Sequence, residues 1–545
     1  MRGGGGRRRQ AVRLLIAAAL SAAASFGAAA WRRASAPRAW EPREVGVAFW
    51  AWRDRAPAQD DVSRAAQETG ARTLFLRAGQ LSLDGGRVAR VRAVEGRLPS
   101  GVELHLVYNA TPALLTAFEK VDEVELAAAA AETFRADAER AAREGARVAG
   151  LQLDLDVPTR LLARYGRVLA EARRRLPPGA RLSVTGLTTW MDLARELKAM
   201  LGAADFWVPQ FYGAEIPERA ERAVPISSPR AVERGAARAR ELGKPFYAGL
   251  AAYGHALLYS PRGRLVELRG DLDPARVAAD RNFELVERRA FERAADGRPP
   301  DAPLASEWRY VFRAQSEAVL DGLVVRAGDT LVLDVPSGEH LRAGARGVRR
   351  SAGDKLLGIC LFRLPTRGDP TTLTLEQIAA ALRDTESRVS TRVEAATGEG
   401  APQETPSNQL LLTATNDGAA GSLFGDDALA VTLRLAGGRL RGVTRLEGFD
   451  SFETLCAPGE PSGAGRGGGR AADALRPCSA ARAGYVRLRA RGWPGGARAR
   501  VGLSFEGERP EELAARVAVR ADDGRLWERE LTLKTEVALK TKEGR

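Results

Sequence analysis

Residues 149–156 read Ala-Gly-Leu-Gln-Leu-Asp-Leu-Asp, and their alternation is the strongest indication of the fold. Successive side chains of a strand face opposite sides, so the leucines share one face while Gln152, Asp154 and Asp156 share the other. In a barrel of parallel strands, the apolar face meets the surrounding helices. The polar face then points into the barrel and towards its C-terminal rim, where active sites form.

Two carboxylates placed together inside a barrel favour a particular chemistry. Desolvation and like charge both disfavour ionisation of Asp154 and Asp156, so we expect the pair to retain one proton near neutral pH. A protonated carboxyl group beside a carboxylate is the arrangement that general acid catalysis needs. The alternative is a structural pair satisfied by backbone donors and by arginines at other strand ends, such as Arg77 and Arg363.

Strand-like apolar segments recur on both sides of this stretch, with helical patterns between several of them. This alternation predicts a parallel sheet covered by helices, and eight such segments predict a (β/α)₈ TIM-like barrel of the α/β class. The strand segments are 45–50, 73–76, 102–108, 148–155, 182–187, 206–211, 245–252 and 356–362. The helical segments are 61–70, 121–145, 159–176, 189–201, 231–243 and 373–383. Residues 80–100 are an irregular unit, because Asp84-Gly85-Gly86 is typical of a turn between two short strands.

The 545 residues exceed the length of one ordinary domain. About 100 residues separate the seventh and eighth strands, which predicts an insertion over about 260–355 within a barrel of residues 44–385. Short β runs punctuated by Gly and Asp fill residues 408–545 and predict a C-terminal all-β, sandwich-like domain. Segments rich in Pro, Ala and Arg (31–43) and in Thr, Glu, Gly and Pro (386–407) are predicted linkers.

Residues 1–30 have the pattern of a targeting segment, with several arginines before the Ala-rich apolar run Leu14–Ala30. A cleaved signal peptide is favoured over an uncleaved anchor, because the run is short and weakly apolar for a spanning helix. The prediction is an exported protein, periplasmic or secreted, with an anchor in the inner membrane as the alternative. In such a compartment Cys456 and Cys478 either pair or stay free, whereas Cys360 has the setting of a buried thiol.

The composition excludes several classes of protein. Hydrophobic residues make up 45% and charged residues 28%, which is unlike a disordered or polytopic membrane protein. The net charge of +14 comes from 83 Lys and Arg against 69 Asp and Glu, but the arginines are scattered and form no basic stripe with aromatics, so no nucleic-acid partner is predicted. The three cysteines and three histidines lack metal-ligand spacing, so neither a metal nor a cofactor is predicted.

Residues 149–156 resemble the fourth-strand signature of family-eighteen glycoside hydrolases, the chitinase-like barrels. Gly150 matches the Gly of that signature, Gln152 its middle Asp, Asp154 its last Asp and Asp156 its acidic Glu. Residues 207–212, Trp-Val-Pro-Gln-Phe-Tyr, are similar to the sixth-strand segment that supplies a Gln and a substrate-orienting Tyr, and residues 247–254 to the segment that ends in Tyr-Gly. The barrel also resembles a bacterial family catalogued only as a domain of unknown function, whose marks include Leu-Gln-Leu-Asp-Leu-Asp and Pro-Gln-Phe-Tyr-Gly.

The resemblance implies a glycoside hydrolase-like protein that acts on a polysaccharide or an amino-sugar glycan. Asp156 would be the general acid and Asp154 its charge-stabilising partner, with Tyr212 and Gln210 orienting the sugar. Three positions depart from the family pattern, because Ala149 and Gln152 replace Asp, and Asp156 is one methylene shorter than Glu. The shorter acid supports the alternative function, a non-catalytic glycan-binding barrel of the cell envelope.

Aromatic and polar residues at strand ends are candidates for binding the sugar, because aromatic rings stack on sugar rings. Each has an alternative role in core packing, and His255 after the seventh strand is expected at the surface or behind the site. The predicted substrate-binding residues are Trp50, Trp52, Tyr108, Gln152, Trp190, Gln210 and Tyr253, and the predicted catalytic residues are Asp154, Asp156 and Tyr212.

Overall fold

The computed structural model describes residues 45–213, 215–292, 302–396, 408–435, 438–457 and 475–534. The predicted targeting segment (1–30) and the first predicted linker (31–43) lie outside these ranges. Among the described residues, no helix combines the length and the apolar character that crossing a membrane requires.

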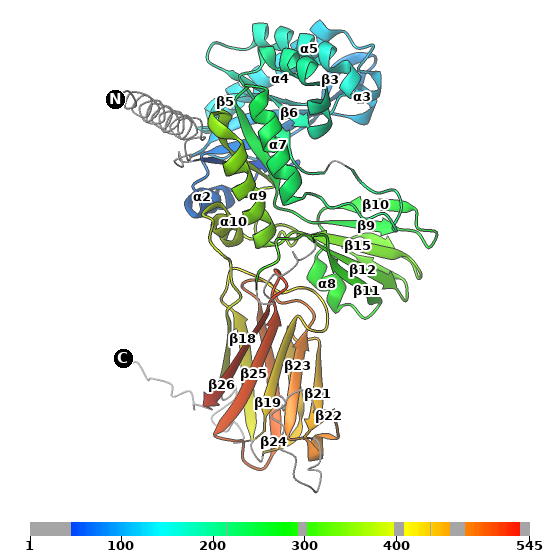
Figure 1. The fold of residues 1–545 in the computed structure, drawn as a ribbon, viewed down its shortest axis with the longest axis vertical. Helices are drawn as coiled ribbons and strands as arrows, with labels where there is room; N and C mark the ends of the chain where they lie inside the picture. The colour runs from blue at the N-terminus through cyan, green and yellow to red at the C-terminus, as the bar shows by residue number, and fades with distance from the viewer. Residues whose placement is uncertain are drawn as a thin grey trace, which may run out of the picture. The chain divides into compact units, whose positions relative to one another are not determined.

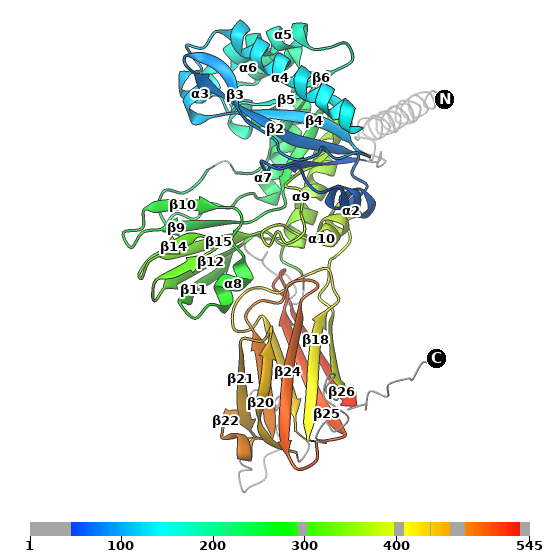
Figure 2. The ribbon, with the colours of Figure 1, turned by 180° about the vertical axis from the view of Figure 1, so that it is seen from behind.

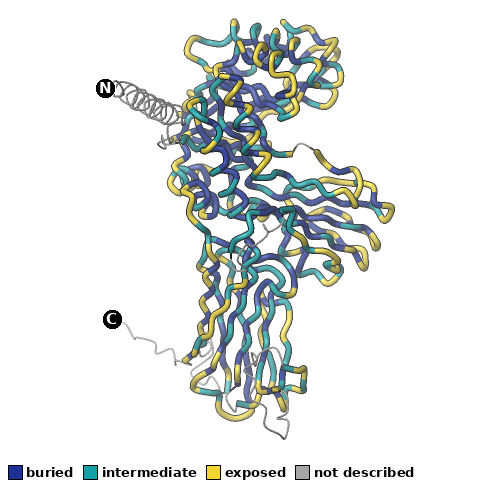
Figure 3. The backbone as a smooth tube through the Cα atoms, viewed as in Figure 1, coloured by how far each residue is buried: buried dark blue, intermediate teal, exposed yellow. Residues whose placement is uncertain are grey.

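Eight parallel strands form a closed barrel, as predicted (Figures 1 and 2). Their order is β1-β16-β8-β7-β6-β5-β4-β2, and β1 pairs with β2 to close the ring. The strands are β1 (Gly46–Ala51), β2 (Thr73–Asp84), β4 (Glu103–Ala110), β5 (Arg147–Asp154), β6 (Arg181–Leu187), β7 (Phe206–Gln210), β8 (Phe246–Ala251) and β16 (Leu356–Phe362). Most of their residues are buried, because one face packs on helices and the other fills the barrel (Figure 3).

Helices cover the outside of the barrel. They are α2 (Gln59–Thr69), α3 (Pro112–Ala117), α4 (Glu123–Glu144), α5 (Leu162–Arg175), α6 (Ala194–Met200), α7 (Pro229–Glu241), α9 (Gly338–Ser351) and α10 (Leu375–Leu382). Local signals set several boundaries: the Asp122 side chain caps the first turn of α4, and Gly145 ends that helix in the left-handed conformation with φ of 80°. Thr374 and Gln377 form a capping box at the start of α10.

The second unit of the barrel lacks an intervening helix over residues 85–102, as its turn signal predicts. β2 instead folds back into the antiparallel strand β3 (Arg87–Ala93). Gly85 and Gly86 make the turn with φ of 55° and 84°, values that residues with a side chain rarely adopt.

The insertion follows β8 and forms an antiparallel sheet in the order β10-β9-β15-β12-β11. Its elements are β9 (His255–Tyr259), β10 (Leu265–Arg269), α8 (Pro274–Ala279), β11 (Phe283–Ala290), β12 (Trp308–Ala314), the hairpin β13 (Ala318–Leu320) and β14 (Leu323–Val325), and β15 (Thr330–Val335). The predicted insertion of 260–355 also takes in α9. That helix packs between α7 and α10, so it belongs to the wall of the barrel.

Two antiparallel sheets enclose a common core at the C-terminal end of the described chain, as predicted for a sandwich. One sheet has the order β17 (Thr391–Ala396), β18 (Gln409–Asn416), β24 (Arg498–Glu506), β20 (Arg439–Glu447). The other has the order β22 (Arg476–Pro477), β21 (Ser451–Cys456), β23 (Tyr485–Ala490), β19 (Leu429–Arg434), β25 (Glu512–Arg520), β26 (Leu526–Lys534). Cys456 and Cys478 form a disulfide, and Cys360 is a buried free thiol.

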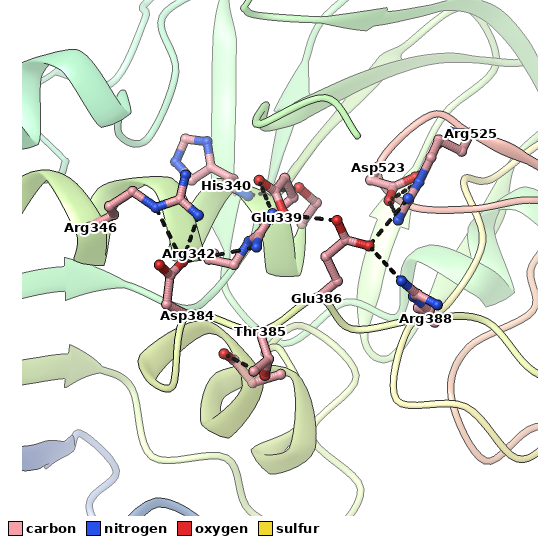
Figure 4. Close-up of polar contacts among 12 residues, drawn as sticks. Glu339, His340, Arg342, Arg346, Asp384, Thr385, Glu386, Arg388, Asp523 and Arg525 are labelled. Atoms are coloured by element: carbon pink, nitrogen blue, oxygen red, sulfur yellow. Dashed lines mark hydrogen bonds and ion pairs between the residues drawn. The ribbon is translucent and has the colours of Figure 1, made fainter. Parts of the chain in front are cut away.

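The predicted linker 386–407 differs from the structure over its first part. Residues 391–396 are strand β17, because Thr391 and Val393 alternate into the sandwich core. Glu386 forms ion pairs with Arg388 and Arg525, each at 3.4 Å, and its carboxylate lies 3.8 Å from Arg342 of α9 (Figure 4). Residues 397–407 lie outside the described part of the chain.

Candidate active site

The end of β5 places a polar column inside the barrel. Gln152 is fully buried and Asp154 is 8% exposed, and both contact side chains of other barrel strands. The leucines between them are buried on the opposite, helix-facing side. The alternation of the sequence therefore sets the direction of the acidic side chains.

Gln152 lies deeper in the barrel than Asp154 and Asp156. Its Oε1 accepts a hydrogen bond from Trp50 Nε1 at 2.9 Å, and its Nε2 lies 3.3 Å from Ser183 Oγ. Trp50 is only 1% exposed and belongs to the interior cluster of the barrel. These two predicted substrate-binding residues thus support the site from below.

Asp154 is held by its neighbours on the next two strands. Its Oδ1 accepts a hydrogen bond from the Thr185 hydroxyl on β6, and Gln210 Nε2 on β7 lies 3.5 Å from the same oxygen. Burial and the charge of Asp156 raise the pKa of Asp154 to about 7, against the opposing effects of Thr185 and Arg77. The carboxyl group therefore keeps its proton to a higher pH than an ordinary aspartic acid does.

Asp156 follows β5 by two residues and is solvent-exposed at the rim. Partial desolvation by the surrounding rim raises its pKa. Its charge acts on Asp154, so the two carboxyl groups titrate as a pair. The geometry gives one buried and one accessible carboxyl group, which is suited to proton exchange with a bound molecule.

Tyr212 lies beside the acid pair on an aromatic wall. Its ring centroid is 6.4 Å from Trp50, 6.2 Å from Tyr253 and 5.6 Å from Phe362 at the end of β16. Burial, Tyr253, Cys360 and the charges of the acid pair together raise the pKa of Tyr212 well above its usual value. Its hydroxyl group therefore stays protonated and can donate a hydrogen bond near neutral pH.

Trp52 also lies beside Phe362 and is partly exposed. The ring centroids of Trp52 and Phe362 are 5.8 Å apart, and the guanidinium of Arg77 lies 5.6 Å from the Trp52 ring. Arg77 also donates to Asn109 at 3.1 Å. Trp52 is thus the predicted tryptophan that keeps an accessible surface at the mouth.

Two predicted sugar-binding residues face the helix layer instead. Tyr108 is fully buried, and its hydroxyl donates to Asp137 of α4 at 2.8 Å. Trp190 is also fully buried and donates to the carbonyl oxygen of Val157 at 3.1 Å. Because strands alternate, Asn109 points inward at the end of β4 and Tyr108 must point outward. Neither ring can contact a ligand at the mouth in this conformation.

The two remaining polar residues considered at strand ends have local partners. His255 Nε2 lies 3.3 Å from Asp334 in the insertion. Arg363 donates to Asp369 at 2.8 Å and to the carbonyl oxygen of Gly270 at 2.6 Å. Arg363 therefore anchors the loop after β16, and Arg77 is the arginine whose charge acts on Asp154.

Two residues near the site were not singled out from the sequence. Thr185 contacts Asp154, and the alternation of residues 182–187 beside the acidic strand is the signal that could have revealed it.

Glu307 is 1% exposed and accepts backbone hydrogen bonds from Ile226 at 2.8 Å and Ser227 at 3.2 Å. Burial raises the pKa of Glu307 to about 8, and burial together with the charge of Glu307 raises the pKa of Tyr253. About 80 residues separate these partners in the chain, so no local pattern indicates the contact.

Within the described ranges, no group of three or more His, Cys, Asp or Glu side chains is placed to hold a metal ion.

Comparisons with solved structures find distant similarities. The spore cortex-lytic enzyme SleL of Bacillus cereus is 14% identical with a TM-score of 0.41, over 64% of this chain and 76% of that one. The SleL enzyme of Bacillus megaterium is 13% identical with a TM-score of 0.42, over 63% and 75% of the two chains. A chitinase from Chromobacterium violaceum is 14% identical with a TM-score of 0.40, over 62% and 98%.

No curated protein matches the sequence. Residues 117–286 match the family described as Domain of unknown function (DUF3142). This range includes the acidic motif of β5 and the Pro-Gln-Phe-Tyr-Gly motif that begins in β7. The matched range runs from the barrel into the insertion, and it confirms the predicted relation to a bacterial family of unknown function.

Proposed function

We propose that the barrel is a glycoside hydrolase that acts on a polysaccharide or an amino-sugar glycan. The observation that carries the proposal is the pair Asp154 and Asp156, in which both pKa values are raised and only one carboxyl group is exposed. In a structural ion pair, the positive partner would stabilise the ionised carboxylate and lower its pKa. This pair favours retention of a proton instead, which is what donation to a glycosidic oxygen requires.

Each residue of the mouth has a role in this reaction. Asp156 is the proton donor, because it is the accessible member of the pair. Asp154 shares the proton with it and, once ionised, stabilises positive charge that develops on the sugar. Gln210 and Thr185 hold Asp154 in place, and the Tyr212 hydroxyl donates a hydrogen bond that orients the substrate.

Partly exposed aromatic rings support a sugar as the ligand. Trp52 and Tyr212 both lie beside Phe362 on one wall of the mouth, and aromatic faces of this kind stack on the apolar faces of sugar rings. The segment 1–30 and the Cys456–Cys478 disulfide support export, because disulfides persist in oxidising compartments. We infer that the protein acts outside the cytoplasm, on a glycan of the cell envelope or its surroundings.

A second candidate function is glycan binding without cleavage. It is favoured by the length of Asp156, since a Glu at this position would carry its carboxyl group about 1.5 Å farther, and a misplacement of about 1 Å can cost a hundredfold in rate. The binding function needs only the aromatic wall and the polar groups of the mouth.

Purified protein incubated with a panel of bacterial polysaccharides tests both functions. Release of reducing ends by the parent but not by Asp156→Asn is expected of the hydrolase. Binding of a glycan with no release by the parent would replace the hydrolase by the binding barrel. Asp354→Asn is the matched control, because Asp354 is exposed and precedes β16, at the end of the barrel away from the mouth.

A further inference from the structure

We propose that the mouth recognises an acidic glycan, through a group of arginines on the side formed by β16, β1 and β2. This inference rests on the proposed glycan function and adds the substrate class. The group, called the arginine rim below, consists of Arg53, Arg77, Arg92 and Arg363 together with Asp54 and Asp369.

The arginine rim contains two sets in which one carboxylate is shared by two guanidinium groups. Asp54 lies 2.5 Å from Arg77 and 3.1 Å from Arg92. Asp369 lies 3.1 Å from Arg53 and 2.8 Å from Arg363. In each set two guanidinium groups share one carboxylate, so the arginines of the set outnumber its acids by one.

Both sets lie at one side of the barrel mouth. Arg53 and Asp54 are neighbours in the loop after β1, Arg77 is in β2, and Arg363 follows β16 directly. The three strands are adjacent, because β1 pairs with both β16 and β2. The positive charge is therefore concentrated at this side, whereas the acid pair follows β5 elsewhere on the ring.

The rim has a fixed inner part and an accessible outer part. The Asp369 side chain is fully buried, and those of Arg363 and Arg77 are 13% and 14% exposed. The Arg53 and Arg92 side chains are 52% and 61% exposed. A guanidinium has five donors in a planar fork, so these outer arginines keep donors for a second carboxylate after binding the first.

The arginine rim interacts electrostatically with the acid pair, and it contacts the aromatic wall. The charge of Arg77 acts on Asp154, and the Arg77 guanidinium lies against the Trp52 ring. A sugar chain that extends from Trp52 towards the acid pair therefore passes the positive side of the mouth. A neutral glycan would leave this charge unused, whereas a carboxylate on a sugar would complete the outer ion pairs.

These features favour a glycan over a nucleic acid as the acidic ligand. The excess charge is confined to two sets, and Asp154 and Asp156 oppose a phosphate at every unit of a chain. A glycan with a carboxylate on only some of its sugars can avoid that repulsion. The ligand class is thus a polysaccharide that contains uronic acids or other carboxylated sugars.

Affinities for hexasaccharides of equal length test the inference. The acidic set is hexamers of hyaluronan, polygalacturonate and alginate, and the neutral set is hexamers of chitin, cellulose and starch. We expect at least one acidic hexamer to bind about tenfold more tightly than every neutral one at low ionic strength, with the advantage shrinking as salt is added. Arg53→Gln and Arg92→Gln should each weaken the acidic hexamer several-fold and leave the binding of neutral hexamers unchanged.

Arg147→Gln is the matched control, because Arg147 is a 76% exposed, ion-paired arginine at the first residue of β5, the far end of the barrel. It should change no affinity. Equal binding of neutral and acidic hexamers would overturn the acidic preference and leave the proposed glycan function standing. Failure of all six hexamers to bind would overturn the glycan function itself. Equally tight binding of a thymidine hexanucleotide would show general attraction of anions and overturn the inference.

Discussion

The side-chain amide of Gln210 on β7 lies 3.5 Å from Asp154 Oδ1 at the end of β5, across the intervening strand β6. Thr185 on β6 donates to the same oxygen, so three consecutive strands converge on one carboxyl group. This convergence fixes the buried acid while leaving Asp156 free at the rim.

Asp156→Asn should abolish proton donation without disturbing the fold. The amide has nearly the same shape as the carboxyl group, but it cannot supply the proton that the leaving oxygen needs. The turnover rate should fall about 10²–10⁴-fold, whereas the glycan affinity should stay within about twofold. Reducing-end release and calorimetric binding check the two quantities separately. A variant with the parental rate would exclude Asp156 as the acid.

Asp154→Asn should stabilise the protein above neutral pH. The unfolded carboxyl group titrates near 3.8 and the folded one near 7, so this group lowers stability progressively as pH rises from about 4 to about 7. The amide does not titrate and can still accept the Thr185 hydrogen bond. The free energy of unfolding in urea should be higher than the parental value by about 1–3 kcal/mol at pH 8 and nearly equal to it at pH 4.

The exposed control Asp354→Asn should show no such pH-dependent gain, because Asp354 is 72% exposed. A loss of stability at pH 8 for Asp154→Asn would mean that the hydrogen bonds and charges around Asp154 outweigh the cost of burying its carboxylate.

Thr185→Val should move the pH dependence of activity. The Thr185 hydrogen bond favours the ionised form of Asp154, so its removal raises the Asp154 pKa further. The pair then holds its proton to higher pH, and the alkaline fall in kcat should shift upward by about half a pH unit or more. Thr185→Ser keeps the hydroxyl group and should restore the parental profile. An unchanged profile in Thr185→Val would mean that the hydroxyl group does not control the acid.

Replacing both Cys456 and Cys478 by Ser should destabilise the sandwich without affecting the mouth. The disulfide joins residues 22 positions apart, and closing a loop of that length in the unfolded chain is worth about 3 kcal/mol. Thermal unfolding should begin earlier in the double variant, with glycan affinity unchanged. Thiol titration of the native parent should find Cys360 unreactive, because it is buried. Two reactive thiols in the untreated parent would contradict the bond.

The sequence was sufficient for the barrel and for the direction of the acid pair, because both follow from periodicity within single strands. The same periodicity, applied strictly to β4, places Asn109 inward and excludes Tyr108 from the mouth. Trp190 follows its strand in a short helical turn, where no two-residue alternation defines a face. The contact between Glu307 and Ile226 depends on how the insertion packs against the loop after β7, which no local pattern records.

The way the insertion is attached has a consequence for the evolution of the barrel. β9 begins four residues after β8 ends, and it pairs with β15, so that His255 lies opposite Asp334 just before the chain enters α9. The departing and returning strands are therefore only about 4.8 Å apart. Because the entropy of loop closure grows slowly with length, the length of the inserted segment has little effect on the free energy of closing the ring. The segment between His255 and Asp334 can accordingly lengthen, shrink or be exchanged among relatives while the eight-stranded ring keeps its register.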